Sequence, residues 1–300
     1  MLGNALIEIC SPESTSLPMG IKPERCRLVF HKLDRDLEKL AAEQQADTVH
    51  RFRTTTRRLQ TLLEELIPER TRRQKKLLKA LRSIRKPAGK LRDLDVQIEA
   101  LRSLKVPLEP HRKTQLLQGL IELRATHEKR LRKRLTKQAA REIRKQLKRI
   151  SREIEIDDSR DPLGAAREVL SRVAVSNGTL TEDALHHCRL LVKRARYTAE
   201  FSQESPAVTQ FIAHLKRLQD ILGNWHDWLA LTHTATERLG GVHESPLVAI
   251  LHNVAGGKLR NAVAAVTSSP ALLSRPKTVP TTPRKTTIKT AQARATASAA

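Results

Sequence analysis

The chain has 300 residues, of which 56 are Lys or Arg and 32 are Asp or Glu, so its formal net charge is +24. An excess of this size predicts an affinity for polyanions such as phosphate polymers. Aromatic residues make up only 2% of the chain, and strong helix formers dominate, which predicts an all-α protein. Three widely spaced cysteines give no pattern of a disulfide framework or a CxxC metal clip.

The first element is expected to be a flexible leader over residues 1–20, which lack the basic segment and apolar run of a signal peptide. No stretch reaches the ~18 uninterrupted apolar residues that a membrane span needs. We therefore expect a cytoplasmic protein with no membrane partner.

Apolar residues at helical spacing predict a first helix from Pro23 to about Gln45. Proline and glycine then divide the pattern, so that helices are expected over 47–67, 70–86 and 91–104. A single long helix is expected over 110–156, and its section 129–153 holds 12 Lys or Arg and two acids. Further helices are expected over 163–175, 181–203, 206–222, 224–239 and 246–266. Residues 267–300 hold no acid and almost no apolar side chains, which predicts a disordered basic tail.

Two segments that lie 136 residues apart share one pattern, apolar-His-x-x-Arg-x-x-x-basic-Arg, and their histidines are His50 and His186. A Gly-x-x-x-Asp pattern follows each segment, ending at Asp93 and at Asp227. Such self-similarity predicts a repeat. We expect two related helical halves, about 21–156 and 161–266, joined through the long basic helix.

Helical geometry groups the charged residues of each segment, because offsets of 0, +3 and +7 fall within about a quarter of a turn of one another. The first stripe is His50, Arg53 and Arg57, and the second is His186, Arg189 and Lys193. Apolar residues take the opposite sides: Phe52, Leu59, Leu63 and Leu66 on the first helix, and Cys188, Leu191, Val192, Ala195 and Ala199 on the second.

Some roles stay open at this stage. The two stripe histidines either donate hydrogen bonds to phosphate or form hydrogen bonds inside the bundle. The long basic helix either extends the binding surface or is an ordinary solvated face. Asp93 and Asp227 follow glycines, so we expect them to cap a helix or to pair with the arginines of the segments. We expect the same of Asp95 and Asp220.

The segments VHRFRTTTRRLQ, LRDLDVQIEAL, LHHCRLLVKRARYTAEF and LKRLQDILGNWHDWLAL resemble, in order, the four signature segments of the CHAD family, the conserved histidine α-helical domain. The resemblance covers about residues 20–266. It implies two pseudo-symmetric helical bundles around a basic central channel, and binding of inorganic polyphosphate without turnover. The chain departs from the family pattern at Gln60, at His187 and in the bulky run from Trp225 to Trp228.

The expected polyphosphate-binding residues combine the stripes with the family segments. They are His50, Arg53, Arg57 and Arg58 from the first segment, and His186, Arg189, Lys193, Arg194 and Arg196 from the second. Lys75, Lys79, Arg82, Lys86 and Lys216 are expected as additional channel residues.

Motifs for catalysis are missing from the sequence. It contains no GxxxxGK[ST] loop, no HExxH, no tight acidic cluster for Mg²⁺ and no ExExK pattern. We therefore expect a protein that is not an enzyme and needs no cofactor or metal, with polyphosphate granules as a place of association. The alternative is a nucleic-acid-binding protein of the nucleoid-associated kind. It would bind the phosphate backbone without sequence preference, because few aromatics are available to stack on bases.

Overall fold

The computed structural model describes residues 20–105, 110–173, 180–269 and 272, and these are almost entirely helical. The expected all-α class is confirmed. The helices are α1 (Pro23–Ala42), α2 (Ala46–Thr61) with a π-helical turn η1 (Leu62–Leu66), α3 (Arg72–Ser103), α4 (Pro110–Arg134), α5 (Lys137–Glu153), α6 (Pro162–Ser171), α7 (Glu182–Ala199), α8 (Pro206–Leu239) and α9 (Pro246–Thr267). The expected leader, up to residue 19, and the tail from 273 lie outside the described residues.

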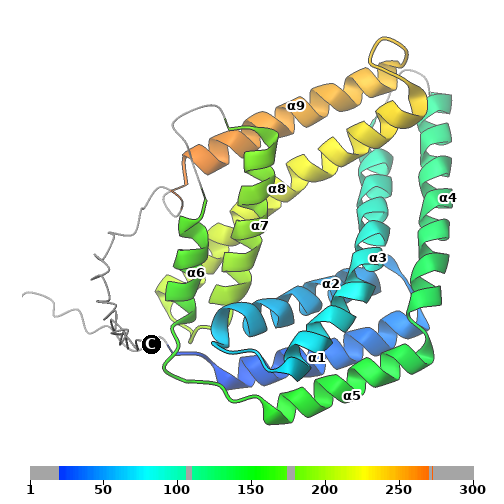
Figure 1. Cartoon of the computed structure of the whole chain (residues 1–300). Coiled ribbons are helices and arrows are strands. Elements are labelled where there is room, and N and C mark those ends of the chain that lie inside the picture. Colours follow the sequence, from blue (N-terminus) through cyan, green and yellow to red (C-terminus); the bar gives the residue numbers. More distant parts are fainter. Residues whose placement is uncertain (1–19, 106–109, 174–179, 270–271, 273–300) are drawn as a thin grey trace, which may run out of the picture.

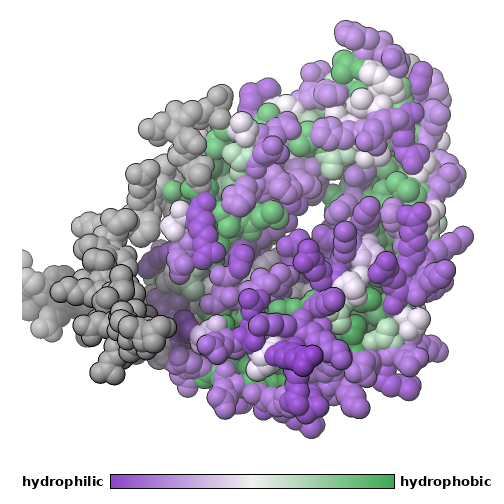
Figure 2. Space-filling model, in the orientation of Figure 1, coloured by the Kyte–Doolittle hydropathy of each residue, from purple (hydrophilic) through white to green (hydrophobic). Residues whose placement is uncertain are grey.

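The helices form an open frame rather than a solid bundle (Figure 1). Packing contacts follow the chain from α1 to α4 and again from α6 to α9, and α5 lies against α1 and α3. The two series meet where α2 contacts α7 and where α3 contacts α8. In the space-filling view, hydrophilic residues surround a hollow at the centre of the frame (Figure 2).

Two expected helix ends are wrong, because α3 continues through Pro87 and α8 continues through Gly223. Proline inside a helix costs about 3 kcal/mol and glycine about 1 kcal/mol. Packing outweighs both costs. The residues around Pro87 include the buried Ile84 and Leu91, and each fully buried apolar side chain of this size contributes about 1.5–3 kcal/mol.

The single long helix expected over 110–156 is also wrong, because the chain turns at Leu135 and Thr136 and forms α4 and α5 instead. The hydroxyl of Thr136 accepts a hydrogen bond from the backbone N–H of Ala139 at 3.1 Å, which caps the first turn of α5. This turn lets α5 bury Ile143 and Leu147 in the same core as α1.

The apolar faces expected on the two segment helices are confirmed. Phe52, Leu59, Leu63 and Leu66 of α2 and η1 belong to one hydrophobic core. Cys188, Leu191, Val192, Ala195 and Ala199 of α7 belong to a second, and a third joins α3 and α4 to α8 and α9. Each stripe of cations therefore lies on the side of its helix that faces away from its core.

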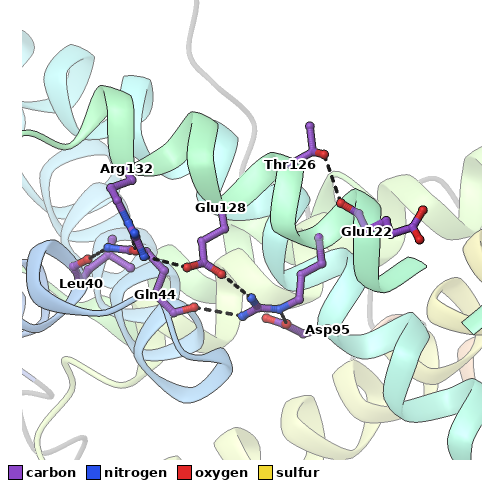
Figure 3. Close-up of polar contacts among 8 residues, drawn as sticks. Leu40, Gln44, Asp95, Glu122, Thr126, Glu128 and Arg132 are labelled. Atoms are coloured by element: carbon purple, nitrogen blue, oxygen red, sulfur yellow. Dashed lines mark hydrogen bonds and ion pairs between the residues drawn. The ribbon is translucent and has the colours of Figure 1, made fainter. Parts of the chain in front are cut away.

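One arginine joins three helices at a corner of the frame (Figure 3). Arg124 of α4 donates from Nε to Asp95 of α3 at 2.6 Å, and from Nη2 to the backbone carbonyl of Gln44, just past α1, at 3.0 Å. Arg132 donates from Nε to the side-chain oxygen of Gln44 at 3.2 Å. Asp95 therefore pairs with an arginine outside the repeated segments, which corrects the expectation for this residue.

None of the helices in the described part of the chain combines the length and the apolar character that a membrane crossing requires.

Candidate functional site

The two stripes of cations meet where α2 packs against α7. Burial, reinforced by the positive charges of Arg189 and Arg57, lowers the pKa of the Lys193 ammonium to about 7. Burial also lowers the pKa of Arg53 and that of Arg189, and neighbouring arginines add to both shifts. The side chain of Arg57 forms no hydrogen bond or ion pair with any residue that the structure describes. The stripes thus form one cluster in which positive charge is only partly balanced.

On the α2 side, Arg53 lies against a glycine of α3. The guanidinium of Arg53 occupies the space that a Cβ on Gly89 would take, so a side chain at this position would displace it. Arg53 Nη2 lies 3.7 Å from Asp93 Oδ1, one helical turn further along α3. Pairing of Asp93 with a segment arginine is confirmed. Capping is wrong, because Asp93 and Asp227 both lie inside continuous helices.

On the α7 side, the corresponding space is empty. Arg189 and Lys193 line a cavity of about 460 Å³ together with residues of α3 and α8, among them Gly223 and Asp227. Apart from the backbone of α8 itself, no atom of the described residues lies within 4 Å of a Cβ built on Gly223. The Nε atom of Arg189 is buried and has no hydrogen-bond partner among the described residues. The negative charge of Asp227 opposes the effect of burial on Arg189, so the pKa of this guanidinium is lowered less than it would be without the carboxylate.

His50 and His186 are both exposed. The pKa of His50 is lowered by partial burial and by Arg92 and Arg53, and the pKa of His186 is lowered by partial burial, His226 and Arg189. Both imidazoles are therefore mainly neutral near pH 7, and a neutral imidazole carries one donor and one acceptor nitrogen. Neither ring forms a hydrogen bond with a described residue, so those nitrogens are available to a ligand.

Three of the arginines expected to bind, Arg58, Arg194 and Arg196, form ion pairs with glutamates. Arg58 Nε lies 2.7 Å from Glu200 Oε2, and Arg196 Nη1 lies 3.0 Å from Glu200 Oε1. Arg194 contacts Glu65 of η1. Arg58 and Arg194 each stand eight residues after the histidine of their segment, and each pairs with an acid of the other segment's helix or its end. We call the pairs Arg58–Glu200 and Arg194–Glu65 the clasp.

The five residues expected as additional channel residues lie at different places in the structure. Lys75, Lys79 and Arg82 line a hollow of about 430 Å³ between α3 and the helix formed by α2 and η1. Lys86 is exposed and does not line that hollow. Lys216 is 2.8 Å from Asp220, and both line a different hollow, of about 670 Å³, that also includes His50.

Arg85 and Arg92 belong to the cluster but were not among the expected residues. Burial, together with Arg57 and Arg53, lowers the pKa of Arg85 to about 10, and among the charged neighbours Arg92 lowers the pKa of His50 most, after burial. The helix end expected at Pro87 would have placed Arg85 and Arg92 on two separate helices. Because α3 is continuous, both arginines lie on the same helix, which packs against α2.

Two comparisons with known proteins agree with this architecture. A family model described as the CHAD domain matches residues 25–236. A solved structure, the crystal structure of the CHAD domain from the plant Ricinus communis, superposes with a TM-score of 0.62, covering 86% of this chain and 96% of that one. The sequence identity is 14%, so this likeness shows the fold alone. No curated protein matches the sequence.

Proposed function

Because the chain belongs to the CHAD domain family, we propose that it binds inorganic polyphosphate at the cations of α2, α3 and α7, without a catalytic step. The proposal includes the expected repeat, with α1–α5 and α6–α9 as related halves, and a basic channel between them. The alternative of binding nucleic acid at this same cluster is an outcome of the test below.

The observation that carries the proposal is the unbalanced charge of the cluster. Arg53, Arg57, Arg189 and Lys193 come from two helices, and the acids that act on them most closely are Asp93 and Asp227. Burial first, and then the positive charges of Arg189 and Arg57, lower the pKa of the half-buried Lys193 ammonium to about 7, so this site disfavours an added positive charge. A polyanion placed there would restore the charge of Lys193 and release counterions from its own phosphates.

The shape of the site favours a slender ligand. Arg189 and Lys193 line a hollow of about 460 Å³ between α3, α7 and α8, and Lys75, Lys79 and Arg82 line another of about 430 Å³ between α2, η1 and α3. A single chain of phosphates can follow such hollows, and arginine forks can hold two phosphate oxygens at a time. A duplex is too wide to enter them, since its major groove alone is about 12 Å across.

The test is a competition experiment on the full chain at physiological salt, with long-chain polyphosphate, duplex DNA and RNA at matched charge. We expect Arg53→Ala/Arg189→Ala to lower polyphosphate affinity about 100-fold, because each lost charge-assisted hydrogen bond costs about 1.5–3 kcal/mol. The matched control, Arg27→Ala/Arg102→Ala, removes two exposed arginines elsewhere and is expected to lower it less than threefold.

Equal competition by DNA, together with unchanged polyphosphate affinity in the Arg53→Ala/Arg189→Ala variant, would overturn the proposal. Release of phosphate from polyphosphate incubated with the protein and Mg²⁺ would overturn its non-catalytic part.

A further inference from the structure

A second cationic surface lies on α5, away from the cluster between α2 and α7. Lys137, Arg141, Lys145, Lys148 and Arg152 are all exposed, and we call these five residues the α5 ridge. Their spacing of +4, +4, +3 and +4 places them within about 80° of one another around the helix, along a line of about 22 Å. Both acids of α5, Glu142 and Glu153, fall outside this sector.

The opposite face of α5 holds the helix in place. Ala140, Ile143, Leu147 and Ile150 are buried, and α5 packs on α1 and α3. The ridge is therefore presented by a fixed, straight helix whose apolar side is already covered. This helix has no free apolar face to insert into a lipid surface, which argues for a ligand that is bound by charge alone.

The arginines beside the ridge use the neighbouring acids. Arg144 pairs with Asp34 at 2.8 Å and with Glu38 at 2.8 Å, and Arg149 pairs with Glu153 at 2.8 Å. The five ridge cations form no ion pair with any residue in the described part of the chain. Like charges at i and i+4 each destabilise a helix by about 0.2–0.5 kcal/mol. A surface that serves only solubility can mix positive and negative charges. The uniformly positive charge of the ridge therefore needs another explanation.

A surface hollow of about 770 Å³ runs beside the ridge. It is lined by six cations and one acid, all from α5: Arg141, Arg144, Lys145, Lys148, Arg149, Arg152 and Glu153. Four of the five ridge residues are among them. Four exposed ridge side chains thus border one shared cationic hollow on the surface of α5.

We propose that the α5 ridge binds the sugar–phosphate backbone of duplex nucleic acid, without sequence preference. The ridge is exposed, straight and about 22 Å long, so a rigid double helix that cannot enter the hollows around α2 can lie along it. No aromatic residue stands between Lys137 and Glu153 to stack on bases, which limits the interaction to phosphates. The inference does not depend on polyphosphate binding, because the two surfaces share no residue.

The experiment compares three forms of the full chain with a random-sequence 25-base-pair duplex and with long-chain polyphosphate. The ridge variant is Arg141→Gln/Lys145→Gln/Lys148→Gln/Arg152→Gln. The matched control, Arg27→Gln/Arg102→Gln/Lys105→Gln/Arg217→Gln, removes the same charge from exposed positions elsewhere. Glutamine keeps the helix propensity high, so circular dichroism and the melting temperature should show both variants folded.

We expect the ridge variant to bind the duplex at least tenfold more weakly at 150 mM salt, and its slope of log affinity against log salt to fall by about 3. Its polyphosphate affinity should change less than threefold, and the control should keep its duplex affinity within threefold. Restoring the charge with Arg141→Lys/Lys145→Arg/Lys148→Arg/Arg152→Lys should retain duplex binding.

An equal loss of duplex affinity in the ridge and control variants, or no loss in either, overturns the inference. A selective loss of polyphosphate affinity in the ridge variant also overturns it, and assigns the ridge to polyphosphate instead. A failure of polyphosphate binding at α2 and α7 would leave these duplex measurements unaffected, so the two proposals fail separately.

Discussion

The α2–α3 side and the α7–α8 side of the cluster carry the same sequence spacing, yet they hold their arginines differently. Arg53 fills the space over Gly89 and lies 3.7 Å from Asp93. Arg189 keeps a buried Nε atom that has no hydrogen-bond partner in the described part of the chain, and no described side chain fills the space over Gly223. A buried donor left unsatisfied costs about 1–3 kcal/mol. The comparison indicates that the α7–α8 side gains more from a phosphate ligand than the α2–α3 side does.

The largest expected effect separates the two arginines. Arg189→Ala should lower polyphosphate affinity about 30-fold and Arg53→Ala about fivefold, because only Arg189 has an unsatisfied buried donor to offer. Titration of each variant with polyphosphate by calorimetry measures both values. Equal losses would show that the difference between the two sides has no consequence for binding.

The second effect is a dependence on pH that resides in Lys193. The pKa of Lys193 is about 7 in the free protein and should rise when a polyanion binds, so binding takes up a proton. Polyphosphate affinity should therefore fall as the pH increases from 7 to 8.5, by up to about tenfold per pH unit. The two histidines, with lowered pKa values, titrate mainly below this window.

Lys193→Met should remove this pH dependence and leave the affinity at the level that the native protein has at high pH. The same variant should melt about 2–5 °C higher at pH 7. The reason is that the lysine pKa is lowered on folding, so its charge disfavours the folded state fully below pH 7 and progressively less up to about pH 10.4. An unchanged pH profile in Lys193→Met would assign the titration to another group.

A smaller effect compares the two glycines. Gly89→Ala should displace the guanidinium of Arg53, which lies 2.3 Å from the new Cβ, and change polyphosphate affinity about threefold. For Gly223→Ala, no described atom outside the helix's own backbone lies within 4 Å of the new Cβ, so this substitution should stabilise α8 by about 0.5–1 kcal/mol. Thermal melts and binding titrations of the two variants give both quantities. The interpretation fails if the two substitutions act alike.

The smallest expected effect on binding belongs to the clasp, which connects the two sides. Glu200→Gln should lower the melting temperature by a few degrees, while polyphosphate affinity measured well below that temperature stays within about twofold. A double-mutant cycle of Arg58→Met and Glu200→Gln should give a coupling of about 0.5–3 kcal/mol. A large loss of affinity with an unchanged melting temperature would return Arg58 to the binding residues.

Local periodicity predicted the helical class, the apolar faces and both stripes, because these depend on residues within about two turns of one another. The sequence could not predict that Pro87 and Gly223 lie inside helices, because the packing that outweighs their cost comes from other helices. The partners of Arg58 and Arg194 were also out of reach, since they lie 142 and 129 residues away along the chain. Among the features that the sequence analysis missed, the turn at Thr136 could have been found from local sequence, because a threonine hydroxyl is a common cap at the start of a helix.

Pro87 gives α3 a weak point next to the cluster. Proline has no N–H, so the carbonyl of Ser83 lacks the donor that it would otherwise have one turn later. Opening of a helix begins where its hydrogen bonds are fewest, and this turn carries Arg85 and precedes Gly89. Away from the fraying ends of α3, hydrogen exchange should therefore be fastest between Ser83 and Leu91 in the free protein. A ligand that bridges α3 to α7 would slow it, which makes this turn an internal reporter of occupancy.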